Sequence, residues 1–170
     1  MRVNNTIAKI LFFITAILMF GFVLNAQVPF SCNYLNEPEP GNVPVLFGEG
    51  VVSVEGENTH ACIFSPDGSM LVFSRYPEKK SYIMTYNKDT RQWTGPDEAF
   101  FQGKETSFSA DGKKIFYYST DGDIYYNKKT DEGWGNAIKL GPAINTSAME
   151  FYPSVTTGGT LFFSRGGKWE

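Results

Sequence analysis

The feature that most constrains this chain is a short segment that occurs three times. Residues 64–75 begin with Phe-Ser-Pro-Asp-Gly and end with Phe-Ser-Arg, and residues 108–119 and 155–165 carry similar segments. A serine near the end of each copy is spaced 45 residues from the next in both intervals: Ser74, Ser119 and Ser164. This spacing predicts a fold built from repeated units of about 40–50 residues.

Each copy is expected to form two strands joined by a tight turn, because apolar residues flank a step that ends in glycine. Pro66 fixes the φ angle of the second turn position, and Gly68 adopts a positive φ without a Cβ clash. These residues predict a type I turn closed by a left-handed glycine. We interpret the aspartates as turn residues and not as catalytic carboxylates. The turn residues of the three copies are Pro66, Asp67, Gly68, Asp111, Gly112, Gly158 and Gly159.

The first 26 residues are expected to be a secretory signal peptide. Arg2 and Lys9 precede a mostly apolar run at positions 10–24, and Ala26 followed by Gln27 fits a cleavage site. The run is shorter than the roughly 20 apolar residues that a membrane helix needs. We therefore expect an exported protein, periplasmic or extracellular, with no stable membrane span after cleavage. A retained N-terminal anchor is the alternative.

The charge of the chain bears on its possible partners, and its cysteine content bears on whether a disulfide forms. Without Arg2 and Lys9 the chain keeps 13 basic residues against 18 acidic ones. Nucleic-acid binding relies on Lys and Arg that neutralise phosphates, so no nucleic-acid partner is expected. The two cysteines, Cys32 and Cys62, permit one disulfide in an exported protein. The alternative is two free thiols, with Cys62 buried and Cys32 exposed.

The remaining chain divides into a leading segment and three repeats. Residues 27–58 are rich in proline and glycine and are expected to form a loop with an outer strand. The repeats are expected at 59–103, 104–148 and 149–170. Strong β-formers alternate through them, and no helical periodicity follows the signal peptide. Four strands are expected in each complete repeat, at 60–64, 70–75, 81–87 and 93–101, and again at 105–109, 114–119, 123–128 and 136–140.

Four short antiparallel strands in a repeat of this length are typical of a β-propeller blade. At this point a family resemblance becomes specific. The hairpin at 64–68, the strand ending in Ser74-Arg75, and the sequence Asp-Ile-Tyr-Tyr at 123–126 resemble the WD40-like repeats of exported bacterial TolB-like β-propellers. The resemblance covers the chain from His60 to its end. It implies an all-β fold made of four-stranded blades.

The repeats amount to about two and a half blades, whereas a closed propeller has about four to eight. We therefore expect the sequence to be a fragment of a longer chain, and blades supplied by another copy are the alternative. Propellers of this kind serve as scaffolds, receptors and enzyme covers alike. The resemblance therefore says more about the fold than about biochemistry.

Few residues are candidates for chemistry. His60 is the only histidine, so it cannot build a histidine cluster for a metal. Glu105 and Glu150, near the starts of the second and third repeats, are candidates for contact with a cation or ligand. No serine-nucleophile elbow, phosphate-binding loop or zinc spacing occurs, so we expect no catalytic residues, cofactor or metal. The repeated aromatic residues suit packing between blades better than sugar stacking: Tyr117, Tyr118, Tyr125, Tyr126, Trp93 and Trp134.

The resemblance favours a non-catalytic scaffold that binds a protein or a glycan at the cell envelope. Its partners are expected to dock at exposed loops, such as those at 76–81 and 120–122. The alternative is the propeller portion of a hydrolase, either prolyl oligopeptidase-like or polysaccharide-degrading. Its catalytic residues would then lie beyond Glu170.

Overall fold

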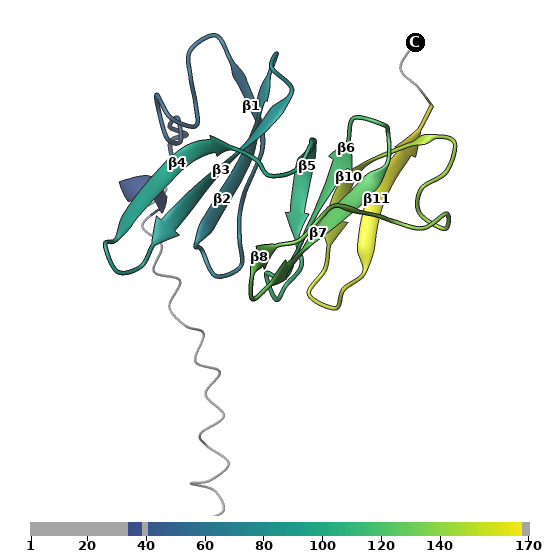
Figure 1. Cartoon of the computed structure of the whole chain (residues 1–170). Helices are drawn as coiled ribbons and strands as arrows, with labels where there is room; N and C mark the ends of the chain where they lie inside the picture. Colours follow the sequence, from purple (N-terminus) through teal and green to yellow (C-terminus); the bar gives the residue numbers. More distant parts are fainter. Residues whose placement is uncertain (1–33, 39–40, 168–170) are drawn as a thin grey trace, which may run out of the picture. The chain divides into compact units, whose positions relative to one another are not determined.

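A computed structural model describes residues 34–38 and 41–167, and these residues form an all-β fold (Figure 1). Among them the only helical element is a single 3-10 turn, η1 (Tyr34–Asn36). The described part of the chain therefore contains no helix with the length and apolar character needed to cross a membrane. The predicted signal peptide lies outside the described residues, as do its cleavage residues Ala26 and Gln27 and the cysteine Cys32.

Three antiparallel sheets follow one another along the chain (Figure 1). Sheet 1 contains, in order, β1 (Asn58–Phe64), β2 (Met70–Tyr76), β3 (Lys80–Asn87) and β4 (Gln92–Glu98). Sheet 2 contains β5 (Gly103–Phe108), β6 (Lys114–Ser119) and β7 (Ile124–Thr130), and both β8 (Gly133–Trp134) and β9 (Ile138–Lys139) pair with β7. Sheet 3 contains β10 (Met149–Val155) and β11 (Leu161–Gly166). The predicted all-β class is confirmed, with antiparallel sheets of four and five strands in the first two repeats.

The three hairpins share one turn. In the first, the amide of Gly68 donates to the carbonyl of Ser65 at 2.8 Å, and Gly68 has a φ of 66°. Gly112 has a φ of 67° and donates in the same way, and Gly159 has a φ of 82°. The second turn position holds a different residue in each copy. Glycine at the closing position is therefore the shared requirement, because only glycine adopts positive φ without a steric penalty.

The strand register corrects the alignment of the repeats that the serine spacing indicated. Counted from the turns, Ser74 and Ser164 occupy the same place in β2 and β11. The equivalent residue of β6 is Tyr118 and not Ser119. Equivalent residues are therefore 44 and 46 positions apart, and not 45 twice. The turn sets the register of each hairpin, so it defines equivalence better than a serine at the strand end.

The first strand of each sheet carries a bulge at the same place. Pairing is interrupted in β1, β5 and β10, four residues before the turn begins. A residue with positive φ sits at each interruption: Ala61 at 49°, Glu105 at 56° and Tyr152 at 55°. A bulge bends its strand and re-aims the neighbouring side chains. The repeat therefore includes a specific distortion as well as a strand pattern.

Neighbouring sheets pack face to face, and burial of β2 on both of its faces explains why the strand begins with a continuous apolar run. Leu71, Val72 and Phe73 are each 0% exposed. Successive side chains of a strand point to opposite faces, so both faces of β2 must be covered. Val72 lies in one buried cluster with Phe108 and Ile115 of sheet 2. That cluster joins the first two sheets.

Sheet 3 packs on sheet 2 through β10, which lies against β5 and β6. The amide of Val155 donates to the hydroxyl of Ser107 at 3.1 Å, and the amide of Tyr152 donates to the carboxylate of Glu105 at 3.2 Å. In sheet 1 the hydroxyl of Ser81 likewise donates to the carbonyl of Gly103 in β5. The first strand of each later sheet is thus held to the sheet before it.

The other face of sheet 1 is covered by the leading segment. Leu71 and Phe73 belong to a second buried cluster that includes three residues of this segment: Leu35, Phe47 and Val52. The predicted outer strand is wrong for the described residues 41–57, which form turns with one parallel bridge between Glu49 and Ser53. Gly48 explains the difference. Its φ is 59°, and an added Cβ would lie 2.8 Å from a methyl of Val52, so the chain turns here instead of extending.

Candidate functional site

The turn aspartates have a structural role in two of the three hairpins. The carboxylate of Asp67 accepts hydrogen bonds from the hydroxyls of Ser65 and Ser69, both at 2.7 Å. Partial burial alone would raise the pKa of Asp67, but these hydrogen bonds lower it below its ordinary value. A hydrogen bond from Ser109 likewise lowers the pKa of Asp111. Both carboxylates therefore remain ionised acceptors that hold the turns closed.

Glu150 is completely buried and is engaged inside the protein. Its carboxylate accepts from the hydroxyl of Thr146 at 2.6 Å and forms an ion pair with Arg165 at 2.8 Å. Burial would raise the pKa of Glu150, but the hydrogen bonds from Thr146 and the positive charge of Arg165 lower it. Arg165 also donates to the carbonyl of Ile144. Glu150 thus fixes the segment that leads into β10 and presents no oxygen to solvent.

Several of the repeated aromatic residues pack inside the protein. The ring of Trp93 lies 5.9 Å from Phe64 and 5.3 Å from Tyr86. The ring of Tyr117 stacks on Phe101 at 4.5 Å, and burial raises the pKa of Tyr117 to about 12. Trp134 stacks on Phe100 at 5.4 Å and Tyr126 lies 5.5 Å from Phe116. These rings contribute to the contacts within and between sheets.

One group of side chains comes from two sheets and is partly exposed, and we call it the Tyr76–Lys104 cluster. Its members are His60, Tyr76, Lys79, Lys104 and Tyr118. The ammonium group of Lys104 lies 5.3 Å from the ring centre of Tyr76 in sheet 1 and 5.8 Å from that of Tyr118 in sheet 2. Lys79 lies 5.8 Å from the same Tyr76 ring, and the ring of His60 lies 5.9 Å from it. Tyr76 is therefore the centre of the cluster.

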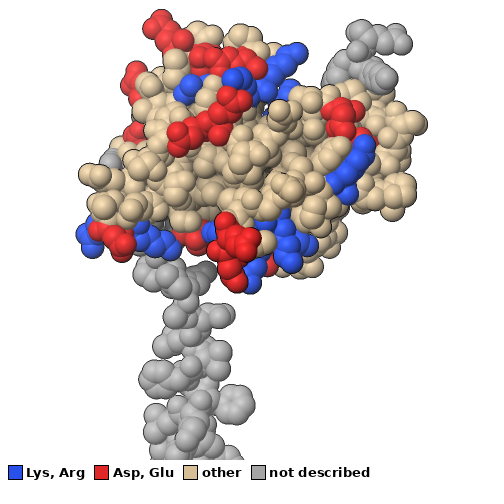
Figure 2. Space-filling view, viewed as in Figure 1, with Lys and Arg blue, Asp and Glu red and all other residues tan. Residues whose placement is uncertain are grey.

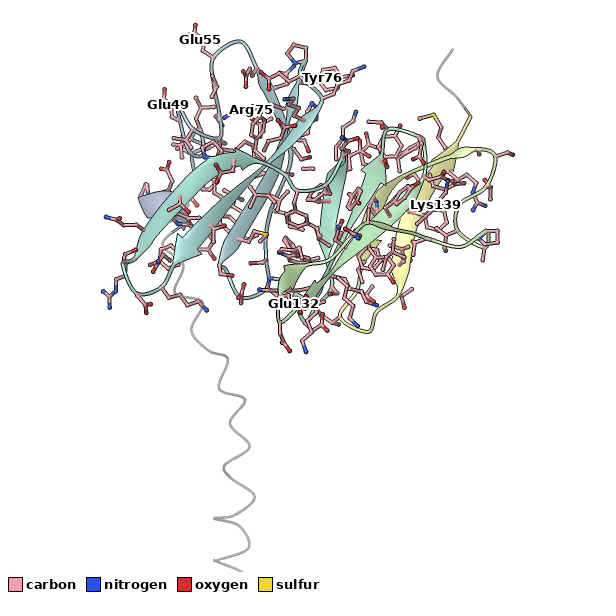
Figure 3. The ribbon with its side chains drawn as sticks, in the orientation of Figure 1. Glu49, Glu55, Arg75, Tyr76, Glu132 and Lys139 are labelled. Atoms are coloured by element: carbon pink, nitrogen blue, oxygen red, sulfur yellow. The ribbon has the colours of Figure 1, made fainter. Side chains whose placement is uncertain are left out.

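The local structure explains how the cluster forms. Lys104 and Tyr118 face each other across β5 and β6 as a cross-strand pair. Tyr76 ends β2, which lies against β5, and Lys79 follows in the turn with a φ of 57°. Figure 3 shows Tyr76 at the margin of sheet 1, at the other end of the strands from Glu132. Tyr76 remains 40% exposed, so its ring is accessible to a ligand.

The charges of the cluster are not neutralised within the described part of the protein. Neither Lys79 nor Lys104 is among the residues that form ion pairs there. Two carboxylates, those of Glu105 and Asp121, act on the Tyr118 hydroxyl. Burial, and then the negative charge of Glu105, raise the pKa of the Tyr118 hydroxyl. The cluster therefore offers two cationic donors, aromatic rings and one acceptor at its edge.

No protein-family model and no curated protein matches this sequence. A functional assignment therefore has to come from the geometry of the site itself. Fold alone does not define a function, because similar scaffolds carry unrelated activities.

The structure brings together some of the predicted candidates and separates others. His60, Glu105, Tyr118 and the loop at 76–81 meet at the cluster. The loop at 120–122 does not belong to it. There Asp121 accepts from the hydroxyl of Tyr125 at 2.7 Å and pairs with Lys139 at 3.6 Å. This second loop is held by its own interactions.

Sequence reasoning missed Lys104, although a signal was present. Lys104 occupies the same repeat position as His60, 44 residues earlier, when the repeats are aligned on their turns. A histidine and a lysine at this position in two consecutive repeats place nitrogen-bearing side chains at the same end of neighbouring sheets. The alignment on the closing serines was shifted by one residue in the second repeat and hid the match.

A groove of about 330 Å³ lies elsewhere, between the leading segment and sheet 1. Two glutamates, Glu37 and Glu49, line it together with Gln92 and Trp93. One carboxylate oxygen of Glu37 already accepts a hydrogen bond from the amide of Gly48 at 2.9 Å, so Glu37 helps to hold the leading segment. Cys62 is a free and exposed thiol and not a buried one. Within residues 34–38 and 41–167, no group of three potential metal ligands comes together.

Proposed function

We propose that this chain is an exported, non-catalytic binding scaffold of the TolB-like propeller type, acting on a protein or glycan at the cell envelope. The observation that carries the proposal is the Tyr76–Lys104 cluster. It places exposed and half-buried aromatic and cationic side chains from two sheets at one end of the strands. Tyrosine is enriched where proteins bind their partners, and the lysines add positive charge beside it.

The repeated sheets support the scaffold part of this proposal. Each hairpin carries the same glycine-closed turn and each first strand carries the same bulge. Each later sheet also packs on the one before it through its first strand. A propeller requires antiparallel sheets that pack face to face in succession, and the stacking of these sheets supports that architecture. A rigid stack of sheets holds the side chains at the strand ends in fixed positions, which reduces the entropy lost on binding.

The distribution of charge supports docking at the strand ends. On the face shown in Figure 2, charged side chains gather along the two margins while the band between them is largely uncharged. Viewed as in Figure 1, that band crosses the middles of the strands. Recognition of a polar or charged partner is therefore best served by the margins.

Site-specific photo-crosslinking tests the proposal in cells. A benzophenone amino acid at position 76 is expected to form a covalent adduct with an envelope component, because Tyr76 is 40% exposed at the centre of the cluster. The same probe at the exposed residue Glu132, at the opposite end of the strands, is the matched control and is expected to give no adduct. Identical adducts from both positions, or retention of the protein inside the cytoplasm, would contradict the proposal.

A further inference from the structure

We infer that the Tyr76–Lys104 cluster binds an acidic glycan whose carboxylate lies between Lys79 and Lys104. This inference rests on the proposed binding function and names its ligand class. The two ammonium groups lie 5.8 and 5.3 Å from one ring centre, so they are at most about 11 Å apart. That separation is near the Debye length of about 10 Å at 0.1 M salt, so both cations act on one anionic group.

The two cations are held in place before a ligand arrives. Lys104 lies over two tyrosine rings from different sheets, and Lys79 lies over one of them. A lysine over an aromatic ring is attracted by the negative face of the ring. This attraction restricts each side chain before binding, so less conformational entropy is lost when a ligand binds. Among the lysines of the described residues, Lys104 alone lies over rings of two sheets, whereas Lys79, Lys114 and Lys129 each lie over one ring of their own sheet.

The charge of the whole chain makes the cluster selective. The formal net charge is −3, so most of the surface repels an anion. At the cluster, Lys79 and Lys104 form no ion pair within the described residues. Of the two carboxylates that act on Tyr118, Asp121 is already paired with Lys139. An anionic ligand is therefore attracted here in preference to the rest of the described surface.

The mixture of groups favours an acidic sugar over a phosphate or a nucleic acid. Sugar hydroxyls donate hydrogen bonds, and the carboxylate of Glu105 at the edge of the cluster can accept them, whereas an ionised phosphate offers no such donor. The exposed face of Tyr76 can contact the apolar face of a sugar ring. Nucleic-acid binding gains its affinity from several neutralised phosphates, and two lysines supply few such contacts. The groups therefore match a hexuronate, which combines a carboxylate with hydroxyl donors.

Titration of the purified protein with an oligogalacturonate tests the inference, and a neutral galacto-oligosaccharide of the same length serves as the reference ligand. The acidic oligomer is expected to bind at least about tenfold more tightly than the neutral one, and its affinity is expected to fall as salt rises from 50 to about 300 mM. Equal binding of the two oligomers would overturn the inference. Tighter binding of inorganic phosphate or of a single-stranded oligonucleotide would also overturn it.

Two double variants locate the site. Replacing both cluster lysines, Lys79→Gln with Lys104→Gln, is expected to weaken oligogalacturonate binding at least about tenfold. The control, Lys114→Gln with Lys128→Gln, makes the same charge change on a facing strand pair outside the cluster and is expected to stay within about twofold of the original affinity. The single change Tyr76→Leu is expected to weaken binding without altering charge. Thermal melting of each variant verifies that it is folded.

The outcomes separate this inference from the proposed function. Equal loss of affinity in both double variants would place the acidic glycan elsewhere and overturn the inference, while leaving a glycan-binding scaffold intact. Crosslinking from position 76 to a protein, without any binding of the acidic oligomer, would also overturn it and retain the scaffold. Failure of both the crosslinking and the titration would overturn the two together.

Discussion

Sheets 1 and 3 carry the same hairpin but differ in what covers them. Val72 in β2 and Phe162 in β11 occupy equivalent positions after the turn. Val72 is 0% exposed because sheet 2 packs over it, whereas Phe162 is 61% exposed. On the opposite side, the leading segment covers Phe73, which is also 0% exposed. The same local sequence pattern thus gives a fully buried strand in one place and a half-covered strand in the other.

The comparison teaches that the hairpin forms through local chemistry, while its contribution to stability depends on its neighbours. Burying a large apolar side chain contributes about 1.5–3 kcal/mol relative to leaving it exposed. Phe73 gains this contribution and Phe162 does not. The hairpin of sheet 3 therefore contributes less to the free energy of folding than the hairpin of sheet 1, although both have the same turn.

The largest expected effect comes from making one substitution in both hairpins. Phe73→Ala removes a fully buried ring and is expected to lower the free energy of unfolding by about 3–5 kcal/mol. Phe162→Ala removes an exposed ring and is expected to change it by less than about 0.5 kcal/mol. Urea unfolding of both variants measures the difference. Equal destabilisation would show that sheet 3 is covered in solution as completely as sheet 1.

The next effect concerns two arginines, which hold the segments that lead into sheet 1 and sheet 3. Arg75 donates to the carbonyl of Val51 and pairs with Glu57 at 3.1 Å, and Figure 3 shows it at the same margin of sheet 1 as Glu49 and Glu55. Arg75→Ala is expected to cost about 2 kcal/mol, since hydrogen bonds to charged groups contribute about 1.5–3 kcal/mol. Hydrogen exchange is expected to accelerate at 41–57.

Arg165→Ala is the matched variant in sheet 3. Arg165 donates to the carbonyl of Ile144 and, like Arg75, lies over the aromatic residue two positions before it. Faster exchange is expected at 144–146 and not at 41–57. Exchange that accelerates throughout the protein in either variant would show that the arginines support global folding and not separate segments.

A smaller effect is expected at the turn that the sheets share. Gly159→Ala forces a side chain into a φ of 82° and is expected to cost about 1–2 kcal/mol. The neighbouring change Gly158→Ala meets no atom closer than 3.9 Å, and its φ lies outside the left-handed region, so its expected effect is below about 0.5 kcal/mol. Thermal melting distinguishes them. A larger effect at Gly158 would contradict the turn assignment.

The last expected effect is on how stability depends on pH. The pKa of Glu150 is lowered in the folded protein from an ordinary value of 4.5. A lowered pKa stabilises the fold above the unfolded pKa, and this contribution is lost as pH falls through the folded value. Glu150→Gln is expected to flatten the pH dependence of stability below about pH 4.5. Arg165, whose side chain is 43% exposed, remains solvated in this variant.

The control for the acid effect is a second carboxylate variant, Glu132→Gln, which changes an exposed residue. Its stability profile is expected to follow that of the original protein. Denaturant unfolding at a series of pH values measures both profiles. An unchanged acid dependence in Glu150→Gln would show that the buried ion pair does not set the acid limit of sheet 3.

Much of the fold was predictable because its determinants are local. Alternating β-formers located the strands within a few residues, and β6 begins and ends where it was expected, at Lys114 and Ser119. The leading segment was predicted less well. Its sequence resembles the region that forms β9, but Gly48 turns the chain over Val52. Val52 belongs to a buried cluster with Leu71 and Phe73 of sheet 1, and the strand pattern of the leading segment does not reveal that contact.

The candidate site was predictable only in part. His60, Tyr118 and the loop at 76–81 were recognised as separate features, and the repeat pattern placed them near strand ends. Their convergence on Tyr76 depends on how β2 and β5 lie against each other. Lys104 contacts rings of both sheets, and a repeat alignment shifted by one residue could not show this.

The sequence by itself determined the all-β class, the glycine-closed turns and the strand order within each hairpin, because these follow from φ preferences and side-chain alternation over a few residues. Only the tertiary structure decided which equivalent residues are buried and which cations meet at Tyr76. Burial and electrostatic contacts depend on surfaces that are distant in sequence and are brought together when one sheet packs on the next.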